Sequence, residues 1–128
     1  MPISNISMKA GKPESYREAI AASVYQALKE ELNVPDVDKF ITITDHGSSN
    51  FFYGDAFGIN RSDELLYISI TVFDSRTRDQ KLKLFERLVQ PLEAKPGVNP
   101  SDVFINLYPL ASENWSVGLG EMQFVSHD

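Results

Sequence analysis

The sequence falls into two halves of 64 residues with a shared pattern, and this repeat restricts the possible folds more than any other feature. When the chain is shifted by 64 residues, the segment 34–43 (VPDVDKFITI) lies over 98–107 (VNPSDVFINL), and four positions are identical. The apolar spacing agrees as well, because Ile20, Val24 and Leu28 fall on Leu84, Leu88 and Leu92. We therefore expect one domain of two related units.

Each half is predicted to form a strand, a helix and a second strand. Apolar residues alternate with polar ones at the ends of each half, and they recur every three or four residues between those ends. The predicted elements are residues 2–8, 13–32 and 40–43 in the first half, and 65–73, 78–94 and 103–107 in the second. The domain is expected to span residues 1–128, with the repeats 1–64 and 65–128.

These elements predict an α/β (α+β) fold, because a strand–helix–strand crossover joins parallel strands. We expect a four-stranded, mainly parallel-paired sheet with both helices on one face. Residues 45–61 are expected to form a loop or hairpin, and residues 114–125 a short terminal hairpin. Too few residues remain to cover the other face of the sheet, so we predict that further copies of the chain cover it in a closed ring.

Composition argues against several classes of function. The net charge is −6 and the twelve Lys and Arg residues form no run, so we expect no nucleic-acid partner. The absence of cysteine excludes disulfide and thiolate chemistry, and His46 and His127 are isolated, so no metal site is predicted. With no long apolar run and no apolar signal core near the first residue, we expect no membrane association and a cytoplasmic location.

Pro2 is the first candidate for catalysis, because removal of Met1 ahead of a small residue would leave a free secondary amine. An α-amino group titrates near about 7.7–8.0. Burial in an apolar pocket would lower that pKa and give a general base, whereas a neighbouring carboxylate would raise it and give a general acid. The alternative is that this proline only opens an edge strand.

Three charged residues could assist such an amine. Asp38 precedes the second predicted strand, whose start lies at the same sheet edge as the start of the first, so its carboxylate and Pro2 could meet. Arg76 and Arg78 stand between the third strand and the second helix, where guanidinium groups can grip a carboxylate with two hydrogen bonds. The alternatives are a turn aspartate and solvated charges, the latter above all for Arg78.

An apolar pocket wall is predicted near the end of the chain. Trp115, Val117 and Phe124 could form it together, although a lone tryptophan is more often part of a core.

Taken in this order, these residues resemble the tautomerase superfamily and, within it, the malonate semialdehyde decarboxylase group, over essentially the whole chain. The resemblance is carried by Met1-Pro2-Ile3, by residues 34–40, 75–81 and 101–103, and by residues 115–120 with Phe124. It implies a homotrimer of β-α-β repeats, no cofactor and a small anionic oxo-acid substrate.

The resemblance also implies roles for individual residues. Pro2 carries a proton or polarises a carbonyl group, and Asp38 binds the prolyl nitrogen or orients water. Arg76 and Arg78 hold the substrate carboxylate. Trp115 and Phe124 match positions of the apolar wall.

Two positions depart from the decarboxylase pattern. That group has two arginines separated by one residue, but aligned on Gln80 and Lys81, Arg76 matches the second arginine and Asp74 replaces the first. A carboxylate there would repel an anionic substrate. Val117 also replaces an aromatic residue.

The predicted function is therefore keto–enol tautomerisation of a small oxo acid. The alternatives are a decarboxylase or hydratase of the malonate semialdehyde type, and a trimeric binding or scaffold protein that has lost the chemistry.

Overall fold

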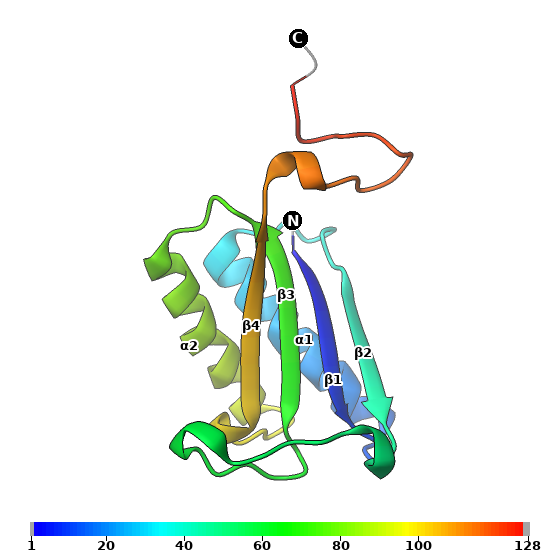
Figure 1. Cartoon of the computed structure of the whole chain (residues 1–128), viewed down its shortest axis with the longest axis vertical. Helices are drawn as coiled ribbons and strands as arrows, with labels where there is room; N and C mark the ends of the chain where they lie inside the picture. Colours follow the sequence, from blue (N-terminus) through cyan, green and yellow to red (C-terminus); the bar gives the residue numbers. More distant parts are fainter. Residues whose placement is uncertain (1, 127–128) are drawn as a thin grey trace.

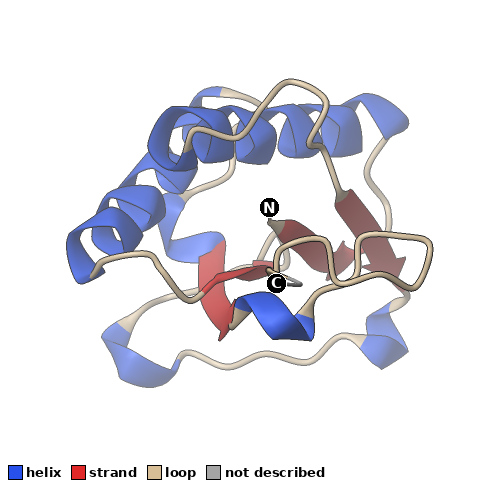
Figure 2. Cartoon of the chain, turned by 90° about the horizontal axis from the view of Figure 1, so that it is seen from above, coloured by secondary structure: helices blue, strands red, loops and turns tan. Residues whose placement is uncertain are grey.

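In the computed structural model, which describes residues 2–126, two helices pack against one face of a four-stranded sheet (Figure 1). Seen from above, both helices lie on the same side of the sheet (Figure 2). The elements are β1 (Ile3–Lys9), α1 (Glu14–Leu32), β2 (Ile41–His46), β3 (Leu66–Phe73), α2 (Arg78–Ala94) and β4 (Val103–Leu110). The predicted α+β fold is confirmed, and no helix among the described residues is long and apolar enough to cross a membrane.

The strand order is β2-β1-β3-β4, with two parallel pairs joined by one antiparallel pair in the centre. β1 pairs with β2 and β3 with β4 in parallel, while β1 and β3 run in opposite directions. As a result, β1 and β2 begin where β3 and β4 end. We call this edge the Pro2 end of the sheet, and the opposite edge the Asp102 end.

The core lies between the sheet and the helices. Strict alternation along β3 sends every second side chain into it, and the helices contribute stripes at four-residue spacing. Its fully buried members include Leu66, Ile68 and Ile70 of β3, Ile20, Val24 and Leu28 of α1, and Leu84, Leu88 and Leu92 of α2. The repeated apolar pattern of the sequence therefore marks the helix faces that meet the sheet.

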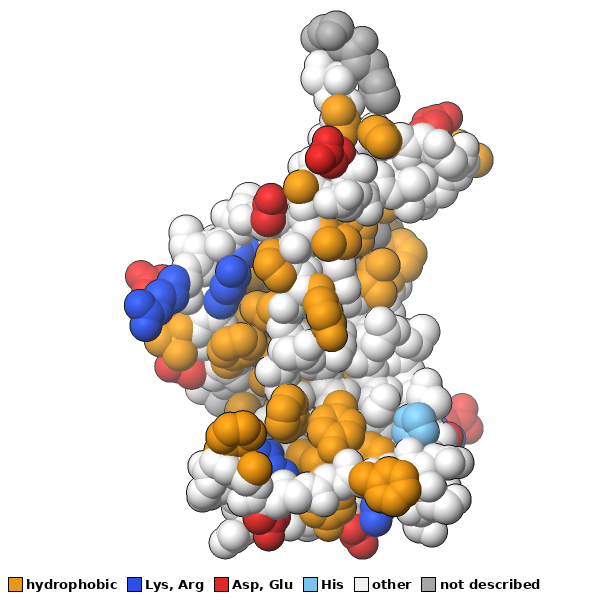
Figure 3. Space-filling model, in the orientation of Figure 1, with side chains coloured by type: hydrophobic (Ala, Val, Ile, Leu, Met, Phe, Trp, Pro, Cys, Tyr) orange, Lys and Arg blue, Asp and Glu red, His pale blue; other side chains and the backbone are white. Residues whose placement is uncertain are grey.

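The other face of the sheet is open in the single chain. Its centre is polar: the Thr42 hydroxyl donates to Asn5 Oδ1 at 2.7 Å, and the Ser69 hydroxyl donates to Asn106 Oδ1 at 2.8 Å. Apolar side chains gather toward both ends of the same face (Figure 3). This face therefore offers an aromatic surface at each end with a hydrogen-bonded band between them.

The terminal hairpin predicted for residues 114–125 is not formed, and that part of the prediction is wrong, whereas the segment 45–61, predicted as a loop or hairpin, forms a loop after β2 ends at His46. Within the described residues, the segments after β2 and β4 contain short 3-10 helices and no strand: η1 (Ser48–Asn50) and η2 (Ala56–Gly58), and η4 (Ser112–Asn114). Phe57 has a φ of 68°. Leu119 has a φ of 62° and lies between Gly118 and Gly120, which also have positive φ. These left-handed conformations interrupt the extended backbone that a hairpin strand requires.

A capping box fixes the start of α2 at the Pro2 end. The Thr77 hydroxyl accepts from the Gln80 amide at 3.1 Å, and Gln80 Oε1 accepts from the Thr77 amide at 2.8 Å. We expect Thr77→Ala to lower the free energy of unfolding by about 1 kcal/mol, measured by urea denaturation at one protein concentration. Ser75→Ala, an exposed neighbour outside the helix, is the control and should change stability by less than half of that. Equal effects of both changes would contradict a specific role for the cap.

Candidate functional site

The strand register brings Pro2 and Asp38 to the same end of the sheet. Ser4 of β1 pairs with Ile41 of β2, and the Ser4 amide donates to the Phe40 carbonyl at 3.0 Å. Pro2 lies two residues before Ser4 and Asp38 two residues before Phe40, so the two strands lead both residues to one edge. Pro2 is buried and Asp38 is half-buried. Parallel pairing therefore leads Pro2 and Asp38 to the same end of the sheet.

Arg76 enters the same end from the segment between β3 and α2. β3 neighbours β1 with Ile3 opposite Thr71, so the chain that leaves β3 passes beside Pro2. The Arg76 side chain is half-buried, and its Nη2 donates to the Leu32 carbonyl, at the end of α1, at 3.3 Å. Its Nε is buried and finds no hydrogen-bond acceptor among the described residues.

The two other charged residues of this segment point to solvent. Asp74 is exposed, and its amide donates to the Leu110 carbonyl at 3.0 Å. Arg78 is exposed as the first residue of α2. Of the two predicted arginines, Arg76 is thus the one that the fold turns inward.

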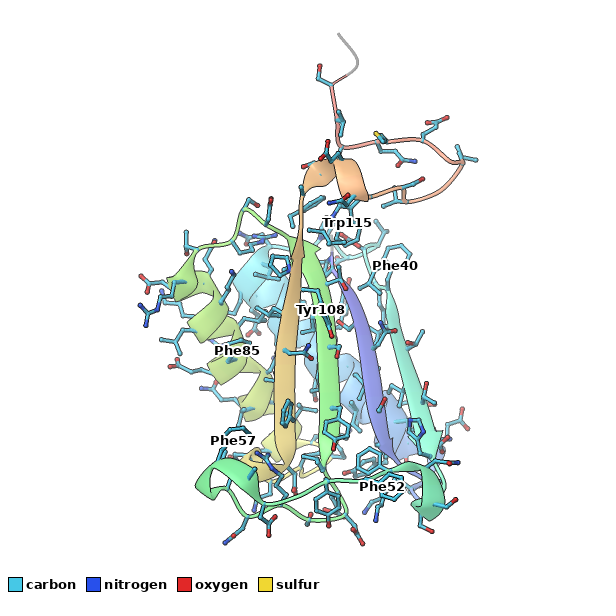
Figure 4. The ribbon with its side chains drawn as sticks, viewed as in Figure 1. Phe40, Phe52, Phe57, Phe85, Tyr108 and Trp115 are labelled. Carbon is cyan, nitrogen blue, oxygen red and sulfur yellow. The ribbon has the colours of Figure 1, made fainter. Side chains whose placement is uncertain are left out.

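Aromatic side chains line this end on the open face of the sheet. Trp115, which is 5% exposed, packs on Phe73 with ring centroids 5.3 Å apart, and Phe124 meets Phe73 edge-on at 5.0 Å. Figure 4 shows Trp115 and Tyr108 here together with Phe40. The segment that follows β4 passes over this end of the sheet (Figure 1).

The predicted wall is only partly assembled in the single chain. Trp115 and Phe124 meet through Phe73, but Phe124 is still 41% exposed and Val117 is 45% exposed. Phe73 was missed by the sequence reasoning. The signal for it was the alternation along residues 66–73, which assigns this last strand residue to the open face.

Two buried donors at this end have no acceptor within residues 2–126, Arg76 Nε and Trp115 Nε1. A buried N–H group without a partner destabilises the protein by about 1–3 kcal/mol, and such groups are uncommon in native structures. A carboxylate within reach of either group would supply the acceptor that it lacks. No group of three or more His, Asp or Glu residues in the described chain could hold a metal ion, and His127 lies outside it. The arrangement is suited to a small organic anion with an apolar part.

Comparison with known proteins identifies the family. A family model described as a tautomerase enzyme matches residues 38–118. The probable tautomerase YusQ of Bacillus subtilis is 35% identical over 126 residues, which cover 98% of this chain and 99% of that protein. The chain belongs to the tautomerase family. The resemblance inferred from Pro2, Asp38 and the later segments is thereby confirmed at the level of the superfamily.

Solved structures share the fold over more than nine-tenths of the chain. The crystal structure of FG41 malonate semialdehyde decarboxylase inhibited by 3-bromopropiolate is 33% identical, covers 95% of this chain and 93% of that one, and superposes with a TM-score of 0.88. A fused 4-OT symmetric trimer shares the fold with a TM-score of 0.78 at 16% identity, covering 93% and 94% of the two chains.

Proposed function

We propose that this tautomerase-family chain is a cofactor-independent enzyme that interconverts the keto and enol forms of a small oxo acid through the amine of Pro2. Membership of the family supports an enzyme of this kind. The observation that carries the proposal is the burial of Pro2 at the sheet end that also receives Asp38 and Arg76. Removal of Met1 is part of the proposal, because an amide nitrogen is not basic.

The reaction needs one group that both accepts and donates a proton. In ketonisation, the free amine takes the proton of the enol O–H and the carbonyl group forms, which leaves the former double-bond carbon to be protonated by the resulting ammonium. The protonated amine returns the proton, so no oxidant, metal or second substrate is required. A positioned acid–base group of this kind contributes about 100- to 10,000-fold to a rate. Asp38 would stabilise the ammonium form by its negative charge.

Substrate binding is assigned to Arg76 and the aromatic wall. The guanidinium and the indole N–H would donate to the carboxylate of the oxo acid, since both have buried donors without an acceptor in the described chain. Phe73 and Phe124 would contact the carbon skeleton and exclude water, which strengthens every charged hydrogen bond in the pocket. An anionic substrate with a short apolar chain or ring fits this set of groups.

We also propose that the enzyme is a homotrimer whose subunits cover the open face of the sheet. Tyr108 of β4 is 53% exposed on that face, and Phe40 at the Pro2 end is also exposed. The relative described as a fused 4-OT symmetric trimer has the same fold. Assembly would also enclose Phe124 and Val117, which are open in the single chain.

Decarboxylation is the second candidate, favoured by the 33% identity to FG41 malonate semialdehyde decarboxylase. The protonated amine of Pro2 would polarise the carbonyl group of a 3-oxo acid. The bond to the carboxylate then breaks, its electron pair forms the enol, carbon dioxide leaves, and the enol carbon takes up a proton. Addition of water to an alkyne acid would use the same groups. Asp74 is exposed but takes the place of an arginine of the group, so this route would lack the second cation that holds the substrate carboxylate there.

A two-substrate assay tests the proposal. We expect the purified protein, with the loss of Met1 verified by intact mass, to ketonise phenylenolpyruvate and to release little carbon dioxide from malonate semialdehyde. Brisk decarboxylation with slow ketonisation would assign the chain to the second candidate. If the processed protein turned over neither compound, the catalytic proposal would be wrong and a binding role would be left.

A further inference from the structure

The two ends of the sheet are built alike. After β2 comes η1 and then Phe51, and after β4 comes η4 and then Trp115; each of these aromatic residues is 5% exposed. The residues that precede the strands also correspond, with Asp38 ahead of β2 and Asp102 ahead of β4. The Asp102 end is therefore a second version of the Pro2 end.

The acid–base groups of the Asp102 end cannot act as those of the Pro2 end are proposed to do. Asp102 is buried, and both carboxylate oxygens are used: Oδ1 accepts from the Ser62 amide at 2.7 Å and Oδ2 from the Ser62 hydroxyl at 2.6 Å. The position that corresponds to Pro2 is Leu66, in mid-chain, which carries no amine. Only the binding features of such a site can persist here.

A cavity does persist at this end, with a volume of about 190 Å³. Its walls include Tyr53, Phe57, Arg61, Leu65, Tyr67 and Phe104. The two phenol groups are hydrogen-bonded elsewhere, Tyr53 to Asp63 at 2.8 Å and Tyr67 to the Phe52 carbonyl at 2.7 Å, so their rings rather than their hydroxyls are left for a ligand. The hydrogen bond to Asp63 raises the pKa of the Tyr53 hydroxyl. A cavity of about 150 Å³ lined by apolar side chains holds one benzene ring.

Arg61 is the one charged side chain among the cavity walls. Its guanidinium lies 5.3 Å from the centre of the Phe104 ring, and one nitrogen donates to the Ser101 carbonyl at 3.3 Å. No acidic side chain of the described residues forms an ion pair with it. A half-buried guanidinium with donors to spare binds carboxylates well. Figure 4 shows Phe57 at the Asp102 end and Trp115 at the Pro2 end, so this cavity is separate from the candidate active site.

We propose that this cavity is a second ligand site that binds a single-ring aromatic carboxylate, with the carboxylate on Arg61 and the ring between Phe57 and Phe104. The combination of aromatic walls and one cation selects this class, because a neutral ring would leave Arg61 without an anion and an aliphatic dicarboxylate would place a second charge among rings. The site lies at the end of the sheet opposite Pro2, so the proposal does not depend on the proposed reaction.

The test is a titration of the full-length protein with 4-fluorobenzoate, followed by fluorine NMR. We expect Arg61→Gln to weaken binding about tenfold or more, since it removes a charge-assisted hydrogen bond. Arg76→Gln, the matched change at the Pro2 end, should leave this binding within about twofold. Uncharged 4-fluorobenzamide should bind the unmodified protein about tenfold more weakly than the acid.

Arg61→Gln also removes the hydrogen bond from Arg61 to the Ser101 carbonyl, and that loss alone could weaken ligand binding. A second variant separates the two causes. In the Arg76→Gln background, which removes the anion site at the Pro2 end, Ala56→Trp fills the cavity while Arg61 is kept and should abolish the remaining binding; Ala56→Trp alone should leave the ketonisation rate unchanged. Three results would overturn the proposal: no binding to the unmodified protein at about 10 mM, unchanged affinity in folded Arg61→Gln or in the folded double variant, or loss of binding through Arg76→Gln alone. The last of these would assign the ligand to the Pro2 end.

Discussion

Replacing Pro2 by alanine is expected to lower kcat/KM for ketonisation of phenylenolpyruvate by about 100- to 10,000-fold, the range for removal of a positioned acid–base group. The ring of proline holds the nitrogen at the start of β1, where Pro2 is buried. Alanine would leave a primary amine that turns freely about its backbone bonds. The nitrogen would then spend little time within reach of the enol proton and beside Asp38.

A one-residue extension provides the sharper control for this prediction. Insertion of glycine ahead of Pro2 keeps the proline ring but turns its nitrogen into an amide, which cannot accept a proton. We expect the same loss of activity as in Pro2→Ala, with the mass of the mature chain measured for every variant. If the extended protein kept most of its activity, the nitrogen of residue 2 would not be the acid–base group and Pro2 would serve only the fold.

The pH dependence of the rate distinguishes the two forms in which Pro2 could act. If the free amine takes up the enol proton, activity falls as the pH drops below the pKa of the amine. If the ammonium form polarises a carbonyl group, activity falls as the pH rises above that pKa. We therefore expect the tautomerisation rate to rise with pH through the pKa of the amine, and the decarboxylation rate to fall through the same pKa.

The fold was largely predictable because its information is local and repeated. The four-residue spacing of Ile20, Val24 and Leu28 shows which side of α1 is buried, and the same spacing recurs in α2. The strand predicted over residues 65–73 agrees with β3, whose side chains alternate between the core and the open face. The predicted bounds of α2, residues 78–94, agree with Arg78–Ala94.

The connecting segments were harder to predict, because their backbone is set by positions with positive φ and by tertiary contacts. Residues 114–125 contain alternating apolar residues, which favoured a hairpin, but Leu119 and its flanking glycines take left-handed conformations. Trp115 is buried by contact with Phe73, a residue more than 40 positions away in the chain. No local pattern encodes a contact of that separation.

The candidate site was predictable where strand pairing alone determines it. Parallel pairing of β1 with β2 leads from Ser4 and Ile41 back to Pro2 and Asp38, so that pair follows from the predicted topology. The predicted topology does not determine which of Arg76 and Arg78 faces the site, because Arg76 lies in a loop and Arg78 begins a helix two residues later. Only the packing of that loop against the end of α1 turns Arg76 inward and leaves Arg78 exposed.

Arg76→Gln is expected to lower kcat/KM for an anionic substrate about 10- to 100-fold, mainly through a higher KM, because a charge-assisted hydrogen bond to the carboxylate is worth about 1.5–3 kcal/mol. Arg78→Gln is the matched control, with the same change of charge two residues away on an exposed side chain. It should change kcat/KM by no more than about twofold, since exposed charges interact weakly.

Arg76 also has a structural contact that must be separated from substrate binding. Its Nη2 donates to the Leu32 carbonyl in the last turn of α1, where a cation is favourable against the helix dipole. Loss of that contact alone should lower the free energy of unfolding by about 1 kcal/mol. It should leave KM unchanged both for an oxo acid and for a neutral oxo compound. A binding role instead raises KM for the acid while KM for a neutral analogue stays the same. A variant with lowered stability and an unaltered preference for the acid would remove Arg76 from the binding site, and with it the anchor that sets the substrate carboxylate beside Pro2.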